Sequence, residues 1–167
     1  METINNKTLE KLKYELVRDG IVSYETLEKA EELATQIENS FIPGQFVNPD
    51  NAKAHFETTG PEIWNDTEGV IDCLVAGIGT GGTITGTGRF LKSKNPNIEV
   101  VGVEPDTSPV LSGGTAGPHE LQGIGAGFIP DVLDTTVYDK IITVSTEQAY
   151  SMSRLLGKKE GVVVGIS

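Results

Sequence analysis

The chain has 167 residues, 37% of them hydrophobic and 20 of them glycine, which suits one domain with a core and many tight turns. Its 13 Lys and Arg residues against 24 Asp and Glu give a formal net charge of −11. This charge argues against nucleic-acid and anionic-membrane partners, because phosphate surfaces are bound through cationic side chains. The single cysteine, Cys73, rules out a disulfide framework within the chain and, with no apolar leader at the N-terminus, predicts a cytoplasmic location.

Residues 1–38 are predicted to form an amphipathic helical hairpin. Apolar residues recur at helical spacing on both sides of Asp19-Gly20, which ends the first helix, and Ser23 is placed to cap the second. The apolar positions are Leu9, Leu12, Leu16 and Val17 in the first helix and Leu27, Ala30, Leu33, Ala34 and Ile37 in the second. We expect this hairpin to pack against the rest of the chain, and the alternative is that its apolar side binds a partner.

Residues 39–167 are predicted to form an α/β domain. After a turn-rich connector, a helix is expected over about 49–59, and Gly60-Pro61 should break it before a short helix that runs to Trp64. The apolar run 71–76 predicts a strand, 84–94 a helix, and 99–104 a second strand that is buried on both faces.

The second part of this domain has a long connection and two more predicted strands. Residues 105–135 show no periodicity, and a loop of that length in a compact domain is usually functional. A strand is expected over 141–144, a helix over 147–156 that ends at Gly157, and a strand over 162–164. The alternation predicts a three-layer, Rossmann-like fold with a parallel sheet.

The sequence stops at Ser167, directly after the last predicted strand, where a further helix would be expected in this architecture. We therefore interpret the chain as truncated. An uncovered apolar strand would favour a homodimer that buries it.

A glycine- and threonine-rich stretch at 75–88 (VAGIGTGGTITGTG) follows the first predicted strand. A strand, a glycine-rich turn and a helix in this order form an anion site, because the amides of the first helical turn point at the ligand. Thr80 and Thr83 add hydroxyl donors. The stretch predicts a small-molecule phosphate ligand, and no spacing typical of metal ligands is found elsewhere.

Two kinds of phosphate ligand fit this stretch. Gly77, Gly79 and Gly82 match G-x-G-x-x-G, and Glu104 ends the next strand where a ribose-binding acid belongs, so a dinucleotide site is one alternative. The threonine hydroxyls favour the other, a terminal phosphate monoester with three oxygens to satisfy. His55 and His119 have no nucleophile as a partner, and we expect ordinary polar roles for both.

Several segments together resemble cysteine synthase (O-acetylserine sulfhydrylase) and the related fold-type II enzymes that depend on pyridoxal phosphate. The resemblance covers about residues 29–167, whereas residues 1–28 match nothing that we can place in the family. The segments are 41–49 (FIPGQFVNP), 55–63 (HFETTGPEI), 79–83 (GTGGT), 103–105 (VEP), 108–114 (SPVLSGG) and 122–128 (QGIGAGF).

The resemblance implies roles for individual residues. Gly79, Thr80, Gly81, Gly82 and Thr83 would bind the phosphate of pyridoxal phosphate, and Gln45, Gly125, Ala126 and Gly127 would line the substrate cleft. The complete enzyme of the family makes cysteine from O-acetylserine and sulfide.

Three family segments are missing from the 167 residues: the one that carries the cofactor lysine, the loop for the substrate carboxylate, and the one whose serine meets the pyridine nitrogen. The chemistry requires the lysine, so we predict a phosphate-binding fragment or chimera with no catalytic residues and no activity of its own. The alternatives are a dinucleotide-binding domain and a non-enzymatic scaffold.

Overall fold

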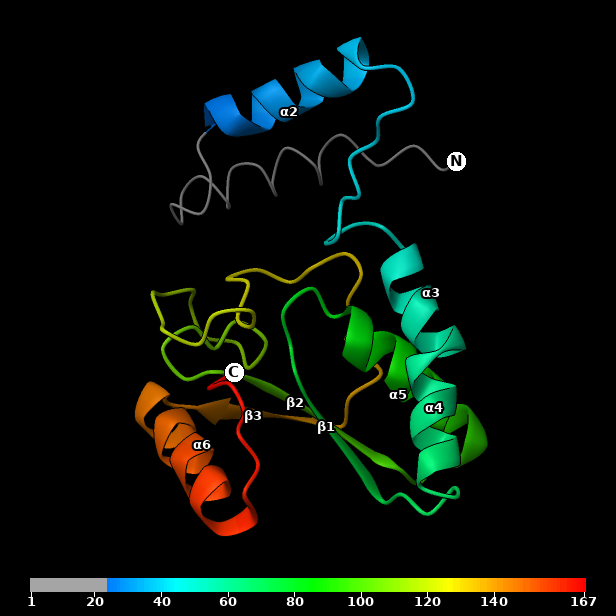
Figure 1. Cartoon of the computed structure of the whole chain (residues 1–167), viewed down its shortest axis with the longest axis vertical. Coiled ribbons are helices and arrows are strands. Elements are labelled where there is room, and N and C mark those ends of the chain that lie inside the picture. The colour runs from blue at the N-terminus through cyan, green and yellow to red at the C-terminus, as the bar shows by residue number, and fades with distance from the viewer. Residues whose placement is uncertain (1–23) are drawn as a thin grey trace.

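A computed structural model of the protein describes residues 24–167 (Figure 1). Its centre is a parallel sheet of β1 (Cys73–Gly77), β2 (Glu99–Pro105) and β3 (Lys140–Val144), in the order β1-β2-β3. In register, Val75 lies opposite Val101, and Val103 lies opposite Ile142. The predicted α/β class with a parallel sheet is confirmed.

Three helices cover one face of this sheet: α3 (Asp50–Glu57), α4 (Thr59–Asp66) and α5 (Gly82–Lys94). Helix α5 follows β1, and both α3 and α4 pack against α5. Gly86 permits the close approach of α3, because a Cβ there would meet the carbonyl of Ala52. The core under α5 contains Ile78, Ile84, Val100, Leu133 and Val137.

The predicted break at Gly60-Pro61 lies two residues too late. Helix α3 ends at Glu57, and α4 begins at Thr59, so that Gly60 and Pro61 lie in the first turn of α4. Proline is tolerated there, since the first amides of a helix have no acceptor inside the helix.

Helix α6 (Thr146–Glu160) follows β3 and begins at a capping box formed by Ser145 and Gln148. The expected end at Gly157 is wrong, because the helix continues to Glu160 and closes at Gly161, whose φ is 71°. Gly157 is the first glycine after the apolar pattern, but the chain reverses at Gly161, the glycine in the left-handed conformation.

The predicted fourth strand at 162–164 is not formed. The sheet of the described residues has three strands, and Val162, Val163 and Val164 are 49%, 93% and 44% exposed. This segment runs back beside α6, where the Ser153 hydroxyl donates to the carbonyl of Val164 over 3.0 Å. An apolar run makes a strand only when a neighbouring strand accepts its backbone hydrogen bonds.

The N-terminal hairpin is described only in its second half. Helix α2 (Tyr24–Gln36) matches the second predicted helix, and the first predicted helix lies outside the described residues. Leu33 and Ile37 are 40% and 54% exposed, so the apolar side of α2 is not packed as we expected. Across the described residues, no helix combines the length and apolar character that crossing a membrane requires.

Candidate functional site

The phosphate loop (residues 79–83) connects β1 to α5 and ends in an uncapped helix N-terminus. Gly81 is the N-cap residue, with φ 84° and ψ −3°, and it makes no side-chain cap. No acidic residue lies in the first turn of α5. The amide of Gly82 makes a long contact of 3.4 Å with Thr80 Oγ1. With no carboxylate in the first turn, the N-terminus of α5 offers amide donors and positive potential to an anion.

Both threonines of the phosphate loop contact side chains of α3. Asn51 donates from Nδ2 to Thr80 Oγ1 over 3.0 Å and to the carbonyl of Gln45 over 2.8 Å. His55 Nε2 lies 3.2 Å from Thr83 Oγ1, and His55 Nδ1 lies 2.8 Å from Thr59 Oγ1. Helix α3 thus holds the two hydroxyls beside the uncapped amides.

Sequence reasoning missed Asn51 and His55 as members of this site. They are four residues apart on α3, a spacing that places two side chains on the same face of a helix. That spacing was visible in the sequence, but nothing showed that this face of α3 meets the phosphate loop. The sequence showed no nucleophile as a partner for His55, and in the structure its Nε2 lies beside the hydroxyl of Thr83.

The structure brings the two predicted cleft segments together beside the phosphate loop. The rings of Phe46 and Phe128 pack with centroids 5.2 Å apart, so the segments that contain Gln45 and Gly125, Ala126 and Gly127 meet at these two rings. The amide of Gly125 donates to the carbonyl of Ile78 over 2.9 Å. Gly79 is required at its position because a Cβ would collide with the carbonyl of Gly123.

The carboxylate of Glu104 is buried and makes hydrogen bonds within the fold. It is 1% exposed and accepts from the amides of Leu111 and Ser112, each over 2.9 Å, and from the Ser112 hydroxyl over 2.6 Å. Both oxygens therefore fasten the loop after β2. The alternative of a dinucleotide site needs this carboxylate free for a ribose, and the structure contradicts that requirement.

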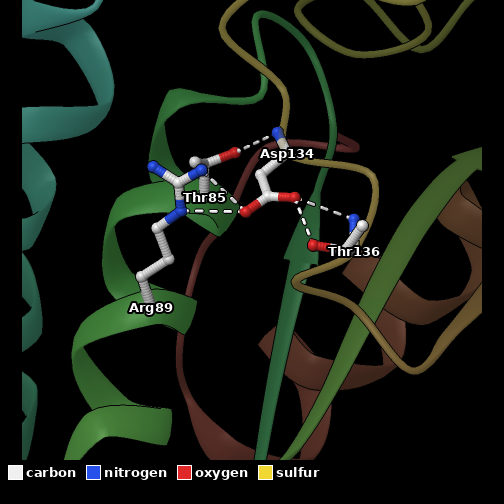
Figure 2. Close-up of polar contacts among 4 residues, drawn as sticks. All are labelled: Thr85, Arg89, Asp134 and Thr136. Atoms are coloured by element: carbon white, nitrogen blue, oxygen red, sulfur yellow. Dashed lines mark hydrogen bonds and ion pairs between the residues drawn. The ribbon is translucent and has the colours of Figure 1, made fainter.

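The segment 134–139 is fastened along α5 (Figure 2). Asp134 Oδ2 accepts from Arg89 Nε over 2.9 Å and from Arg89 Nη2 over 2.7 Å, while its Oδ1 accepts from the amide and hydroxyl of Thr136. The hydroxyl of Thr85 accepts from the amide of Asp134. The hydrogen bond from the Thr136 hydroxyl, assisted by Arg89, lowers the pKa of Asp134.

One turn further along α5, Lys92 Nζ lies 2.7 Å from Asp139 Oδ1, and the other oxygen of this carboxylate accepts from the amide of Val100. The hydrogen bond from Lys92 lowers the pKa of Asp139. Between these two contacts Val137 enters the core against α5, where a Cβ at Gly88 would lie 2.9 Å from it.

A pocket of about 640 Å³ lies between α3, α5 and residues 131–135. Its lining includes Lys53, Phe56, Arg89 and Asp131, and none of the predicted site residues. Two lysines of the described chain form ion pairs away from the phosphate loop, Lys92 with Asp139 and Lys140 with Glu99. The helix N-terminus and the two threonine hydroxyls lie at the phosphate loop, which is therefore the candidate anion site.

Comparison with known proteins identifies the family of this chain. The model of the family described as "Pyridoxal-phosphate dependent enzyme" matches residues 4–167 of this chain. This range includes most of residues 1–28, the segment that the resemblance had left unmatched. Cysteine synthase of Staphylococcus aureus (strain Mu50 / ATCC 700699) is 53% identical over 142 residues, which are 84% of this chain and 46% of that protein.

Solved structures give the same result. Cysteine synthase of Entamoeba histolytica superposes with a TM-score of 0.78 at 41% identity, over 84% of this chain and 41% of its own. A hydrogen sulfide-producing enzyme of Fusobacterium nucleatum has a TM-score of 0.80 at 44% identity, over 88% and 50%. The chain spans about half the length of these relatives or somewhat less. With a family match over nearly all of its residues, the chain belongs to the pyridoxal-phosphate dependent enzymes.

Proposed function

We propose that this chain binds the phosphate group of pyridoxal phosphate at Gly79, Thr80, Gly81, Gly82 and Thr83. The observation that carries the proposal is the uncapped N-terminus of α5, flanked by two hydroxyls that Asn51 and His55 hold in place. The amides and hydroxyls supply several donors in a small space, which is what a phosphate monoester requires.

The other predicted residues have positioning roles in this proposal. Gln45, Gly125, Ala126 and Gly127 would line the side of the cleft that receives the substrate. When bound, pyridoxal phosphate supplies an electron sink for bonds at the substrate α-carbon. The residues of this chain would bind and orient the cofactor through its phosphate and exclude water from one side of it.

The activity of the relatives defines what the longer enzyme would do. Those named cysteine synthase suggest a transferase that makes cysteine from O-acetylserine and sulfide. We propose that these 167 residues do not catalyse this reaction by themselves, because the segment that carries the cofactor lysine in the family is missing from them. The proposal further includes a cytoplasmic location and a homodimer that covers exposed strand surface.

Calorimetric titration of the full chain with pyridoxal phosphate and with inorganic phosphate tests the proposal. We expect both to bind, and we expect Thr83→Val to weaken both by about ten- to a hundredfold, the value of one hydrogen bond to a charged group. Thr35→Val on α2 is the matched control, since Thr35 contacts only the carbonyl of Glu32. Absence of heat with either ligand would reject the phosphate site.

A parallel experiment addresses the missing lysine. After incubation with pyridoxal phosphate and reduction by borohydride, we expect the intact mass of the chain to show no adduct at a single lysine. Stoichiometric labelling of one lysine would show that another residue takes over the cofactor linkage, and it would contradict the proposed inactivity.

A further inference from the structure

His119 lies in the long connection between β2 and β3 and contacts one of the cleft residues. Its Nε2 is 2.9 Å from the carbonyl oxygen of Gly125. A carbonyl oxygen only accepts hydrogen bonds, so Nε2 must carry the proton and donate. The contact therefore assigns the tautomer of this ring.

The amide side of Gly125 is held by Ile78, which lies between the end of β1 and the phosphate loop. Its amide donates to the carbonyl of Ile78 over 2.9 Å, and Ile78 directly precedes Gly79. Gly125 has φ +65°, and a Cβ there would lie 2.6 Å from Pro105 and 2.9 Å from His119 Nε2. The glycine is thus enclosed between the imidazole and the start of the phosphate loop.

The other ring nitrogen of His119 has no comparable contact. Nδ1 is buried and meets no hydrogen-bonding partner within the described part of the chain. The bond from Nε2 is therefore the polar interaction that fixes the ring, and only one of the two neutral tautomers can make it.

We propose that His119 is a positioning residue of the phosphate site. Its Nε2–H holds residues 123–127 against Ile78 and Gly79, and so it sets both the cleft wall and the first residue of the phosphate loop. His119 acts through Gly125 and does not touch the ligand. The effect on ligand affinity rests on the proposed function, whereas the effect on the cleft segment does not.

Two amide variants of the full chain separate the donor from the ring that carries it. In His119→Gln the amide nitrogen lies as many bonds from the backbone as Nε2 does, so the donor to Gly125 is kept. In His119→Asn the side chain is one bond shorter and the donor no longer reaches. The measurements are hydrogen exchange at the Gly125 amide, the ¹⁵N shifts of the ring in the unaltered chain, and titration with pyridoxal phosphate.

We expect the ring to show the Nε2–H tautomer. His119→Asn should exchange the Gly125 amide roughly tenfold faster and bind pyridoxal phosphate about three- to tenfold more weakly, while His119→Gln restores both. The amide of Val101, in a residue 2% exposed on β2, should be unchanged, which separates a local effect from general loosening.

An Nδ1–H tautomer, unchanged exchange at Gly125 in the Asn variant, or failure of Gln to restore protection would overturn the proposal. So would faster exchange with unaltered affinity, because the cleft segment would then not position the loop. If the unaltered chain binds no pyridoxal phosphate, the proposed function fails, and the tautomer and exchange measurements still decide whether His119 holds Gly125.

Discussion

Asn51 is the residue on which the orientation of the Thr80 hydroxyl depends. Its single amide nitrogen donates both to Thr80 Oγ1 and to the carbonyl of Gln45, so it ties the phosphate loop to the connector that precedes α3. Only an amide can do this here, since an isosteric carboxylate has no donor and carries a negative charge.

We therefore predict that Asn51→Asp weakens phosphate binding by about tenfold or more at low ionic strength, through loss of the donor and repulsion of the anion. Titrations with inorganic phosphate at low and high salt would measure this, and the defect should shrink as salt screens the new charge. Asn65→Asp, on an exposed position of α4, adds the same charge away from the loop as a control. Equal affinity in the two variants would contradict the role given to Asn51.

At the scale of elements, the attachment of segment 134–139 to α5 depends on the carboxylate of Asp134, and the effect of its ionisation on stability can be measured. The pKa of Asp134 is lowered in the fold, chiefly by the Thr136 hydroxyl and further by Arg89. A group whose folded pKa lies below its unfolded pKa stabilises the fold above the unfolded value. That contribution is lost as the pH falls through the folded pKa, which lies below the ordinary value near 4 for aspartate.

Asp134→Asn should accordingly lower the free energy of unfolding by about 1 kcal/mol at pH 7, since a charged, two-pronged contact with Arg89 becomes a neutral one. Urea denaturation at pH 7 and at pH 3 is the measurement. The difference between the variant and the unaltered chain should narrow at the lower pH, and a difference that stays constant across this range would exclude ionisation as its cause.

The two glycines at the end of α6 make a matched pair. Gly157 lies inside the helix, and a Cβ there meets only the carbonyl of Val162 at 3.6 Å, an ordinary contact. Gly161 closes the helix with φ 71°. We predict that Gly157→Ala stabilises the chain by roughly 0.5–1 kcal/mol and that Gly161→Ala destabilises it by about 1 kcal/mol. Thermal unfolding followed by circular dichroism would show this, and shifts of the same sign would contradict the assigned helix end.

These glycines also show what local patterns can predict. Helix α5 and the glycine-rich turn before it follow from residues adjacent in sequence, and both were predicted. The end of α6 was predicted at the wrong glycine, because the sequence alone does not show which of Gly157 and Gly161 takes the left-handed conformation. The strand at 162–164 was wrong because a strand needs a neighbouring strand to pair with, which local patterns do not reveal. Asn51 and His55 were missed for the same reason, because their partners in the phosphate loop lie 29 and 28 residues away.

On the scale of the whole molecule, one face of the sheet is exposed along its two edge strands, β1 and β3. Val75 on β1 and Ile142 on β3 are 61% and 45% exposed, while Val101 between them is 2% exposed. Apolar strand surface of this kind favours association. The net charge of −11 opposes the approach of a second copy, and this repulsion is screened by salt.

The proposed homodimer should therefore form more tightly as ionic strength rises, the reverse of an association held by ion pairs. Sedimentation equilibrium over a range of protein and salt concentrations would measure the dimer constant directly. Val75→Lys combined with Ile142→Lys should abolish association by placing two cations on the exposed face, while Val163→Lys adds a cation at a position that is 93% exposed outside the sheet and serves as the control. A chain that stays monomeric at every salt concentration would refute the dimer, and a dimer that dissociates as salt rises would show that charge holds it and not the sheet face.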